Sequence, residues 1–171
     1  MKVIIRKADY NNSQEIDLIV GRSMESILES IPEFEQSPNL ARLAYPDFHF
    51  DFFKGELISH DRNPSHLILV VAQELGDILG HIIIQKHFVE NQNVYGKFLN
   101  LYIDINHRRF GLASQLINEV VGWAKNEELK YLIAKSHVKN IKAQYLFKKC
   151  GFQITNQELN HWPSYEYKIE I

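Results

Sequence analysis

The stretch LYIDINHRRFGLASQLINEVV, residues 101–121, joins an apolar run to an amphipathic pattern through a short polar turn. The run VYGKFLNLYI at 94–103 has the length and the residue types of a strand. Apolar residues then recur at the three-to-four spacing of one helical face: Leu112, Ala113, Leu116, Ile117, Val120, Val121 and Ala124. The stretch therefore predicts a strand, a turn and a helix in direct succession.

The turn has the features of an anion site. A helix that opens directly from a turn presents several backbone N–H groups without intrahelical acceptors, at the positive end of the helix dipole. Gly111 and Ala113 keep bulky side chains away from these groups, and Arg108 adds a forked cationic donor. Two phosphates fit this arrangement better than one carboxylate. The turn lacks the Gly-Lys-Ser/Thr of phosphate-loop enzymes and the G-x-G-x-x-G of dinucleotide-binding folds, so neither nucleotide fold is predicted.

Upstream of this stretch, the sequence predicts a short strand and a long helix. The strand VIIR occupies 3–6, and Asn12 with Glu15 three residues later resembles a capping pair. Apolar residues then recur at helical spacing. Two prolines, Pro32 and Pro38, are expected to end this helix.

The remaining segments continue the mixture of strands and helices. Residues 32–66 are the least regular part, and the aromatic stretch within them fits either a helix or a loop. The other predicted elements are, in chain order, a hairpin at 66–85, a strand at 131–134, a helix from Asn140 to Lys149 that stops at Gly151, and a strand at 165–171. This order predicts one mixed α/β (α+β) domain over residues 1–171, with a largely antiparallel sheet.

The composition narrows the functional class. The 171 residues include 19 Lys and Arg against 21 Asp and Glu, a net charge of -2, which argues against nucleic acid as the main partner. The N-terminal apolar run is too short for export, and no stretch approaches the roughly 18 apolar residues of a membrane span. We therefore expect a soluble, cytoplasmic protein that contacts no membrane. The eight histidines form no His-x3-His pair, and with one cysteine in the chain we expect no metal site.

Two motifs resemble the signatures of the GNAT family of N-acetyltransferases. RRFGLA at 108–113 matches Arg/Gln-x-x-Gly-x-Gly/Ala, and NIKAQYLFKKCGF at 140–152 is similar to Asn-x-x-Ala-x-x-Leu-Tyr-x-Lys-x-Gly-Phe. The hairpin sequence at 69–84 is similar to the strands that precede the first signature. The resemblance implies a mixed sheet whose central strand pair splays apart, with helices on its flanks.

By this resemblance the turn would wrap the pyrophosphate of acetyl-coenzyme A, mainly through backbone N–H groups. That role agrees with the anion site inferred from the residues alone. The residues concerned are Arg108, Arg109, Phe110, Gly111, Leu112, Ala113 and Ser114. Many members of the family carry glycine at position 109, so Arg109 either adds a phosphate contact or faces water.

The resemblance also implies how the rest of the coenzyme would bind. Leu101, Tyr102 and Ile103 would pair with the pantetheine arm, and the Leu101 amide would face the thioester carbonyl as an oxyanion donor. Such a donor is worth about 3 kcal/mol where it has been tested by mutation. Asn140 resembles the asparagine beside the coenzyme arm, and a plain helix N-cap explains the same residue. Acetyl-coenzyme A is the implied cosubstrate, with no metal.

The resemblance is weakest at the groups that move protons. The tyrosine that often protonates the departing thiolate aligns with Phe147, which keeps a coenzyme contact but has no proton to give. Tyr145, two positions away, is a substitute candidate or a structural aromatic.

The general base is equally open. The positions where relatives often hold a glutamate align with Lys97 and Lys135. Glu90, Asp104 and His137 are the remaining candidates, of which His137 has the ordinary pKa best suited to proton transfer. A water relay, or positioning without a dedicated group, would also serve.

The sequence thus predicts an enzyme that transfers acetyl from acetyl-coenzyme A to a primary amine of a small molecule or peptide, by direct attack in a ternary complex. Asp47, Asp51 and Glu56 of the aromatic stretch 45–61 are available to attract the amine, although an amphipathic helix explains the same stretch. Two alternatives stay open: an acyl-coenzyme A binding or sensing module with little or no turnover, and a structural domain without coenzyme. Assembly into a homodimer is also open.

Overall fold

The computed structural model describes residues 2–44, 54–55, 66–73, 75–89 and 92–171. The strands are β1 (Val3–Lys7), β2 (His66–Gln73), β3 (Ile78–Val89), β4 (Gln92–Ile103), β5 (Tyr131–His137), β6 (Gln153–Glu158) and β7 (Ser164–Glu170). The helices are α1 (Ser13–Leu28), α2 (Pro32–Gln36), α3 (Pro38–Ala44), α5 (Leu112–Asn126) and α6 (Ile141–Lys149), and a 3₁₀ turn, Ile105–His107, follows β4. No helix among these residues is long and apolar enough to cross a membrane.

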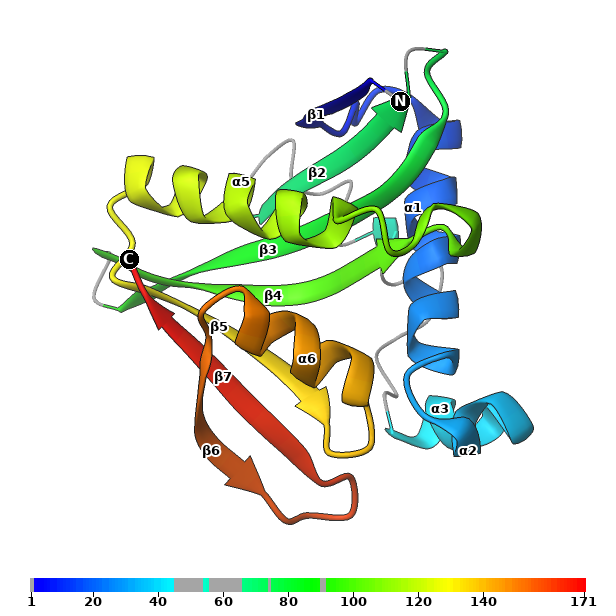
Figure 1. Ribbon diagram of the computed structural model, residues 1–171, viewed down its shortest axis with the longest axis vertical. Coiled ribbons are helices and arrows are strands. Elements are labelled where there is room, and N and C mark those ends of the chain that lie inside the picture. Colours follow the sequence, from blue (N-terminus) through cyan, green and yellow to red (C-terminus); the bar gives the residue numbers. More distant parts are fainter. Residues whose placement is uncertain (1, 45–53, 56–65, 74, 90–91) are drawn as a thin grey trace.

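The strands form one mixed sheet in the order β1-β2-β3-β4-β5-β7-β6 (Figure 1). Among the described strands only β4 and β5 pair in parallel, and the other neighbours are antiparallel. Ile83 packs in a cluster with α1, while Ile82 and Ile84 pack in the cluster that contains α5. Because successive strand residues face opposite sides, α1 and α5 lie on opposite faces of the sheet. The predicted mixed, mostly antiparallel α/β fold is confirmed.

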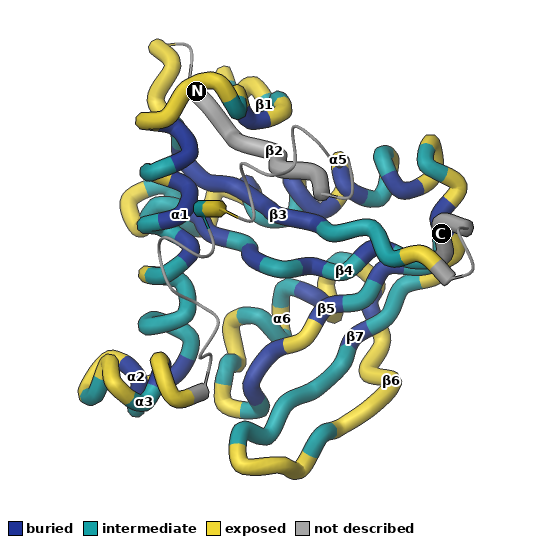
Figure 2. Tube along the Cα trace, turned by 180° about the vertical axis from the view of Figure 1, so that it is seen from behind, coloured by how far each residue is buried: buried dark blue, intermediate teal, exposed yellow. Residues whose placement is uncertain are grey.

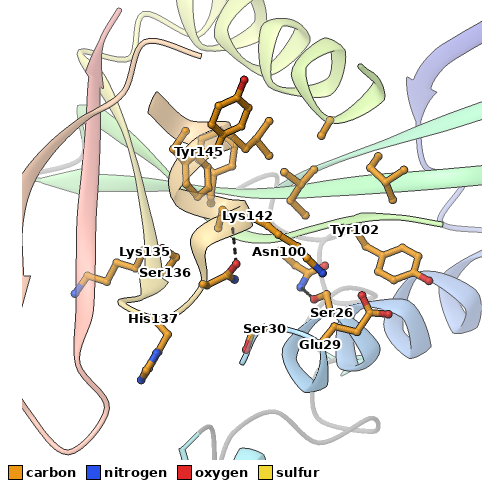
Figure 3. A pocket seen from close by; sticks show the side chains of 18 of the residues that line it. Ser26, Glu29, Ser30, Asn100, Tyr102, Lys135, Ser136, His137, Lys142 and Tyr145 are labelled. Atoms are coloured by element: carbon orange, nitrogen blue, oxygen red, sulfur yellow. Dashed lines mark hydrogen bonds between the residues drawn. The ribbon is translucent and has the colours of Figure 1, made fainter. Parts of the chain in front are cut away.

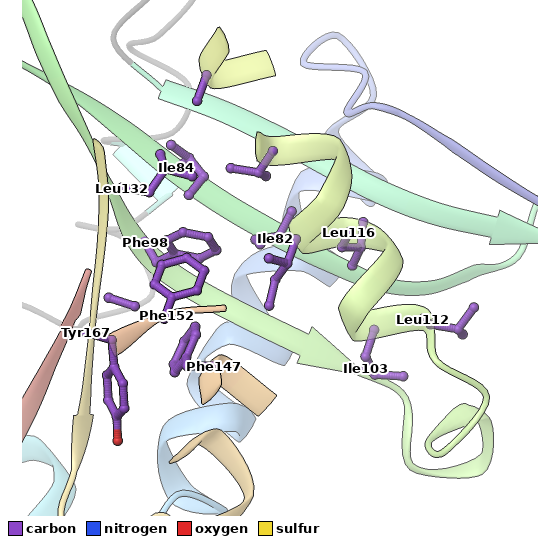
Figure 4. Close-up of a cluster of buried hydrophobic side chains, with 14 of the residues drawn as sticks. Ile82, Ile84, Phe98, Ile103, Leu112, Leu116, Leu132, Phe147, Phe152 and Tyr167 are labelled. Atoms are coloured by element: carbon purple, nitrogen blue, oxygen red, sulfur yellow. The ribbon is translucent and has the colours of Figure 1, made fainter. Parts of the chain in front are cut away.

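The main core lies between the sheet and the helices α5 and α6. The buried face of α5 is the one predicted from spacing, with Ala113 and Val121 partly exposed at its edges. Four aromatic rings gather where α6 meets the strands: Phe98, Phe147, Phe152 and Tyr167 (Figure 4). Each fully buried large apolar side chain stabilises the fold by roughly 1.5–3 kcal/mol.

The parallel pair at the centre of the sheet separates soon after it forms. β4 and β5 pair only over Tyr95–Lys97 and Tyr131–Ile133. Directly beyond this ladder β4 carries a bulge at Leu99, where its register with β3 shifts by one residue. A bulge bends the strand that contains it, so β4 turns away from β5. The splayed pair expected from the resemblance is thus present, and its cause is local.

The N-terminal helices differ from the prediction at the prolines. α1 ends at Leu28, and Pro32 and Pro38 each begin a new helix instead of ending the first. Proline suits the first turn of a helix, because its missing N–H would have no intrahelical acceptor there. The two prolines are therefore helix starts.

Strand β6 was not among the predicted elements. It pairs with β7 at the edge of the sheet, and its residues Gln153–Gln157 are all exposed (Figure 2). An edge strand whose residues are exposed on both faces has no apolar alternation, so periodicity does not reveal it. The candidate carboxylates Asp47, Asp51, Glu56 and Glu90 lie outside the described residues.

Candidate active site

A cavity of about 800 Å³ occupies the space between the diverging ends of β4 and β5. Ser26, Glu29 and Ser30, at the end of α1, form one wall, and Ser136 and His137 of β5 form the opposite wall (Figure 3). The sequence-predicted residues that line it are Leu101, Tyr102, Ile103, Arg108, Arg109, Gly111, Leu112, Ala113, Ser114, His137, Asn140, Tyr145 and Phe147. Phe110 does not line the cavity, and its ring is exposed.

The turn before α5 borders this cavity at the N-terminus of the helix. Gly111 is the N-cap of α5, with a left-handed φ of 79° and no side-chain capping bond. The first N–H groups of a helix have no intrahelical acceptor, and here Leu112, Ala113 and Ser114 border the cavity. This arrangement can bind an anion through several N–H groups at the positive end of the helix dipole.

Arg109 shares the left-handed conformation, with a φ of 68°. For a residue other than glycine this conformation costs roughly 1–2 kcal/mol, which gives a physical reason for glycine at the same position in relatives. The Arg109 side chain is exposed.

The guanidinium of Arg108 turns inward. Its Nε donates to the Ile103 carbonyl at 2.8 Å, and its Nη2 donates to Glu29 Oε2 at 2.6 Å. Its central carbon lies 5.6 Å from the centre of the Tyr102 ring. Arg108 therefore ties the turn to the end of α1. The sequence predicted a phosphate contact for this side chain and did not predict its bonds to Glu29 and Ile103.

A buried polar network behind the α1 wall was also not foreseen. His81 Nε2 lies 2.9 Å from Ser23 Oγ and 2.8 Å from Asn100 Oδ1. Ser23 Oγ donates its own proton to the Ile19 carbonyl, so both oxygens accept from His81 and the neutral ring carries its proton on Nε2. Asn100 Nδ2 in turn donates to Ser26 Oγ at 2.6 Å, on the cavity wall. The sequence signal that could have revealed this network is that Ser23 lies on the apolar face of its helix and that His81 and Asn100 interrupt apolar strands.

Burial makes His81 a neutral residue. It lowers the pKa of His81 to about 4, assisted by the charge of Arg22 and opposed by the bond to Asn100. Nδ1 has no hydrogen-bond partner among the described residues. A fully buried neutral ring exchanges no proton with the cavity, so His81 holds Asn100, and with it the adjacent Leu101, in place.

On the opposite wall, His137 ends β5 with its side chain largely buried. Its Nδ1 accepts the Lys139 N–H at 3.1 Å, so the neutral ring carries its proton on Nε2. Burial lowers the pKa of His137, and the charge of Lys139 lowers it further. At neutral pH the ring therefore offers a donor at Nε2, which is the wrong form for a base at that atom.

The other charged candidates are paired. Burial raises the pKa of Asp104, but hydrogen bonds from Asn106 N–H and His107 and the charge of Arg22 outweigh burial and lower it. Asp104 does not line the cavity. Lys135 does, and its ammonium pairs with Glu158 and Glu166 of the β6–β7 hairpin.

Helix α6 carries three predicted site residues. Asn140 Oδ1 accepts the Ala143 N–H at 3.1 Å, which confirms the N-cap, and Asn140 also borders the cavity. Tyr145 is 71% exposed, and its hydroxyl points away from Asn100 and His137 (Figure 3). Phe147 is 6% exposed, and its ring belongs to the aromatic cluster.

The family model for acetyltransferases of the GNAT type matches residues 26–152, a range that includes both signatures, β4, β5 and the end of α1. The chain belongs to the acetyltransferase (GNAT) family. In this GNAT chain the family's splayed strands, its turn and its second signature meet at one cavity. No curated protein matches the sequence.

Solved structures share the fold over the whole chain or about two thirds of it. The PaiA N-acetyltransferase of Thermoplasma acidophilum, in complex with coenzyme A, has a TM-score of 0.75 at 15% identity, with 100% of both chains covered. The NatC complex bound to Gag peptide and coenzyme A has a TM-score of 0.72 at 13% identity, covering 100% of this chain and 99% of that one. A GNAT acetyltransferase of Elizabethkingia anophelis with acetyl-coenzyme A bound has a TM-score of 0.57 at 19% identity, covering 68% and 82%.

Proposed function

We propose that this protein transfers the acetyl group of acetyl-coenzyme A to a primary amine of a small molecule or peptide. The observation that carries the proposal is one cavity bordered by the uncapped N-terminus of α5, the part of β4 that β5 leaves unpaired, and the wall at the end of α1. The first two suit the coenzyme, and the third leaves room for an acceptor. Structures of the same fold with coenzyme A, acetyl-coenzyme A and a peptide support this division.

In this proposal the coenzyme lies along the turn and β4. The N–H groups of Leu112, Ala113 and Ser114 hold the pyrophosphate, with the helix dipole favouring its charge. The backbone of Leu101–Ile103 pairs with the pantetheine arm. The Leu101 N–H faces the thioester carbonyl, where an oxyanion donor contributes about 3 kcal/mol.

The amine attacks the thioester carbon directly while both substrates are bound. With a lysine-like pKa near 10.4, about one amine in a thousand is neutral at pH 7. His137 offers a donor at Nε2, and Asp104 is paired outside the cavity. We therefore assign the amine's proton to water, and most of the rate to bringing the two substrates together, which is worth roughly 7–11 kcal/mol in well-oriented systems.

Thiol release tests the proposal. The protein is incubated with acetyl-coenzyme A and a panel of polyamines, aminoglycosides, amino acids and peptides with free amines. We expect free thiol to form faster than without amine, together with an acetylated product in the mass spectrum. If no amine raises the rate of thiol release, the proposal fails.

A binding or sensing role is the second candidate, and Phe147 favours it, because the family's hydroxyl is missing at this position. Its signature is coenzyme binding without thiol release across the panel. Binding itself is read from thermal unfolding, since a ligand at 100 times its dissociation constant adds about 2.7 kcal/mol of stability.

A further inference from the structure

The missing hydroxyl at Phe147 raises the question of what protonates the departing thiolate, a question that rests on the proposed function. The Phe147 ring is buried, with its centre 5.1 Å from the centre of the Tyr167 ring. Tyr167 comes from β7, and its hydroxyl lies at the outer end of the aromatic cluster (Figure 4). A phenol thus stands beside the position where relatives carry one.

The Tyr167 hydroxyl reaches the cavity through one serine. Ser136 Oγ lies 3.3 Å from the Tyr167 hydroxyl, and Ser136 lines the cavity from β5. Tyr167 is 0% exposed and Ser136 is 9% exposed, so the Tyr167 hydroxyl is shielded from solvent and Ser136 stands between it and the cavity. Because both hydroxyls rotate, either one can donate to the other.

Three of the other hydroxyls that line the cavity donate their protons elsewhere. Ser26 Oγ donates to the Ser23 carbonyl at 2.8 Å, and Ser30 Oγ donates to the Ile27 carbonyl at 2.6 Å. The Tyr102 hydroxyl donates to Glu25 Oε2 at 3.1 Å.

We propose that Ser136 and Tyr167 act together as the proton donor to the coenzyme thiolate, in place of the hydroxyl that Phe147 lacks. The amine nitrogen forms the new C–N bond and gives up a proton to water, while the C–S bond breaks and its electron pair stays on sulfur. Sulfur takes the Ser136 proton as Ser136 takes the Tyr167 proton, so no serine alkoxide forms. After the thiol leaves, the phenolate regains a proton from solvent through Ser136.

The Tyr167 phenol keeps its proton until the thiolate forms. Burial raises the pKa of Tyr167 and the hydrogen bond with Ser136 lowers it, with burial dominant. The phenol is therefore protonated at neutral pH when the thiolate forms. Ser136 is the catalytic group at sulfur in this scheme, and Tyr167 acts through it.

The test uses Tyr167→Phe and Ser136→Ala with Tyr165→Phe as the matched control. Tyr165 lies two residues from Tyr167 on the same strand and outside the cavity lining. General acid catalysis is worth about 10²-fold or more, so we expect kcat to fall by about 10²-fold in each test variant while KM for acetyl-coenzyme A stays unchanged. The control should keep the wild-type kcat.

Rescue makes the assignment specific. Phe147→Tyr added to Tyr167→Phe places a hydroxyl at the family position, and we expect kcat to recover by tenfold or more. Melting temperatures of all variants identify any loss of fold. If Tyr167→Phe unfolds, kcat of Ser136→Ala tests the proposal in its place. The wild-type kcat should fall at high pH as the Tyr167 phenol ionises, and kcat of Tyr167→Phe should not show this fall.

The outcomes separate this proposal from the function on which it rests. Absence of thiol release from the wild type overturns both. An active wild type with undiminished kcat in Tyr167→Phe and Ser136→Ala overturns the donor assignment alone. An equal loss in Tyr165→Phe, or no rescue by Phe147→Tyr, shows a structural role for the hydroxyl and overturns it too.

Discussion

Arg108 and Glu29 form an ion pair with 2.6 Å between Nη2 and Oε2, across 79 positions of sequence. Arg108 belongs to the turn before α5, and Glu29 is the C-cap residue of α1. The same guanidinium also binds the carbonyl of Ile103, the last residue of β4. The anion-binding turn, the end of β4 and the α1 wall are therefore joined by one side chain.

A double-mutant cycle on Arg108→Ala and Glu29→Ala measures this link. Both side chains are partly exposed, so we expect a coupling of about 0.5–1 kcal/mol in the free energy of unfolding. Arg108→Ala alone should cost more than Glu29→Ala, because it also removes the bond to Ile103 and the contact with Tyr102. Urea unfolding of the four proteins provides the numbers, and additive effects would contradict the link.

Gly111→Val should weaken coenzyme binding strongly while the fold survives. A Cβ at Gly111 meets only Gln115 Nε2, at 4.0 Å, so the obstacle is the φ of 79°, which valine adopts only with strain. The N–H groups of the turn would lose their common direction, and we expect coenzyme affinity to fall at least tenfold in calorimetry.

Gly122→Ala is the control for that variant. Gly122 lies within α5, and an added Cβ there has no neighbour within 4 Å. Alanine should stabilise the helix by up to about 1 kcal/mol and leave coenzyme affinity unchanged. Unchanged affinity in Gly111→Val would remove the turn from the coenzyme site.

Arg109→Gly and Arg109→Ala separate strain from charge. Glycine relieves the left-handed φ of 68°, so we expect Arg109→Gly to raise the free energy of unfolding by about 0.5–1 kcal/mol. Alanine keeps the strained backbone and removes the guanidinium. A loss of coenzyme affinity common to both variants would assign a phosphate contact to Arg109, and unchanged affinity in both would leave its charge in solvent.

What could be predicted from the sequence was local. The strand, turn and helix around Gly111 followed from spacing and one glycine within a short stretch, and Asn140 followed from a single capping position. These features depend on residues only a few positions apart, so the order of residues in the chain is enough to predict them.

What was missed depends on register across the sheet. The Asn100 bond to His81 exists because β3 and β4 pair with the register that follows the bulge at Leu99. The Ser136 contact with Tyr167 depends in the same way on the pairing of β5 with β7. No periodicity encodes which strand will lie beside which, so these contacts were out of reach.

The buried His81 makes stability depend on pH in a defined window. Its folded pKa of about 4 lies below the ordinary value of 6.5, so the unfolded chain binds more protons between these values. The contribution of neutral His81 to the free energy of unfolding is fully present above pH 6.5. It declines as the pH falls toward 4, by about 3 kcal/mol in total. We expect unfolding free energies from urea titrations to fall over this range in the wild type.

His81→Gln isolates that contribution, because carboxylates also titrate at low pH. Glutamine retains an amide N–H donor for Ser23 or Asn100 but does not titrate, so the variant should be less stable than the wild type at pH 7 and approach it as the pH falls. His161→Gln changes an exposed ring instead and should leave the wild-type slope intact. Parallel pH profiles for the wild type and His81→Gln would mean that His81 is not buried as a neutral ring, and the rigid support assigned to Asn100 beside Leu101 would lose its basis.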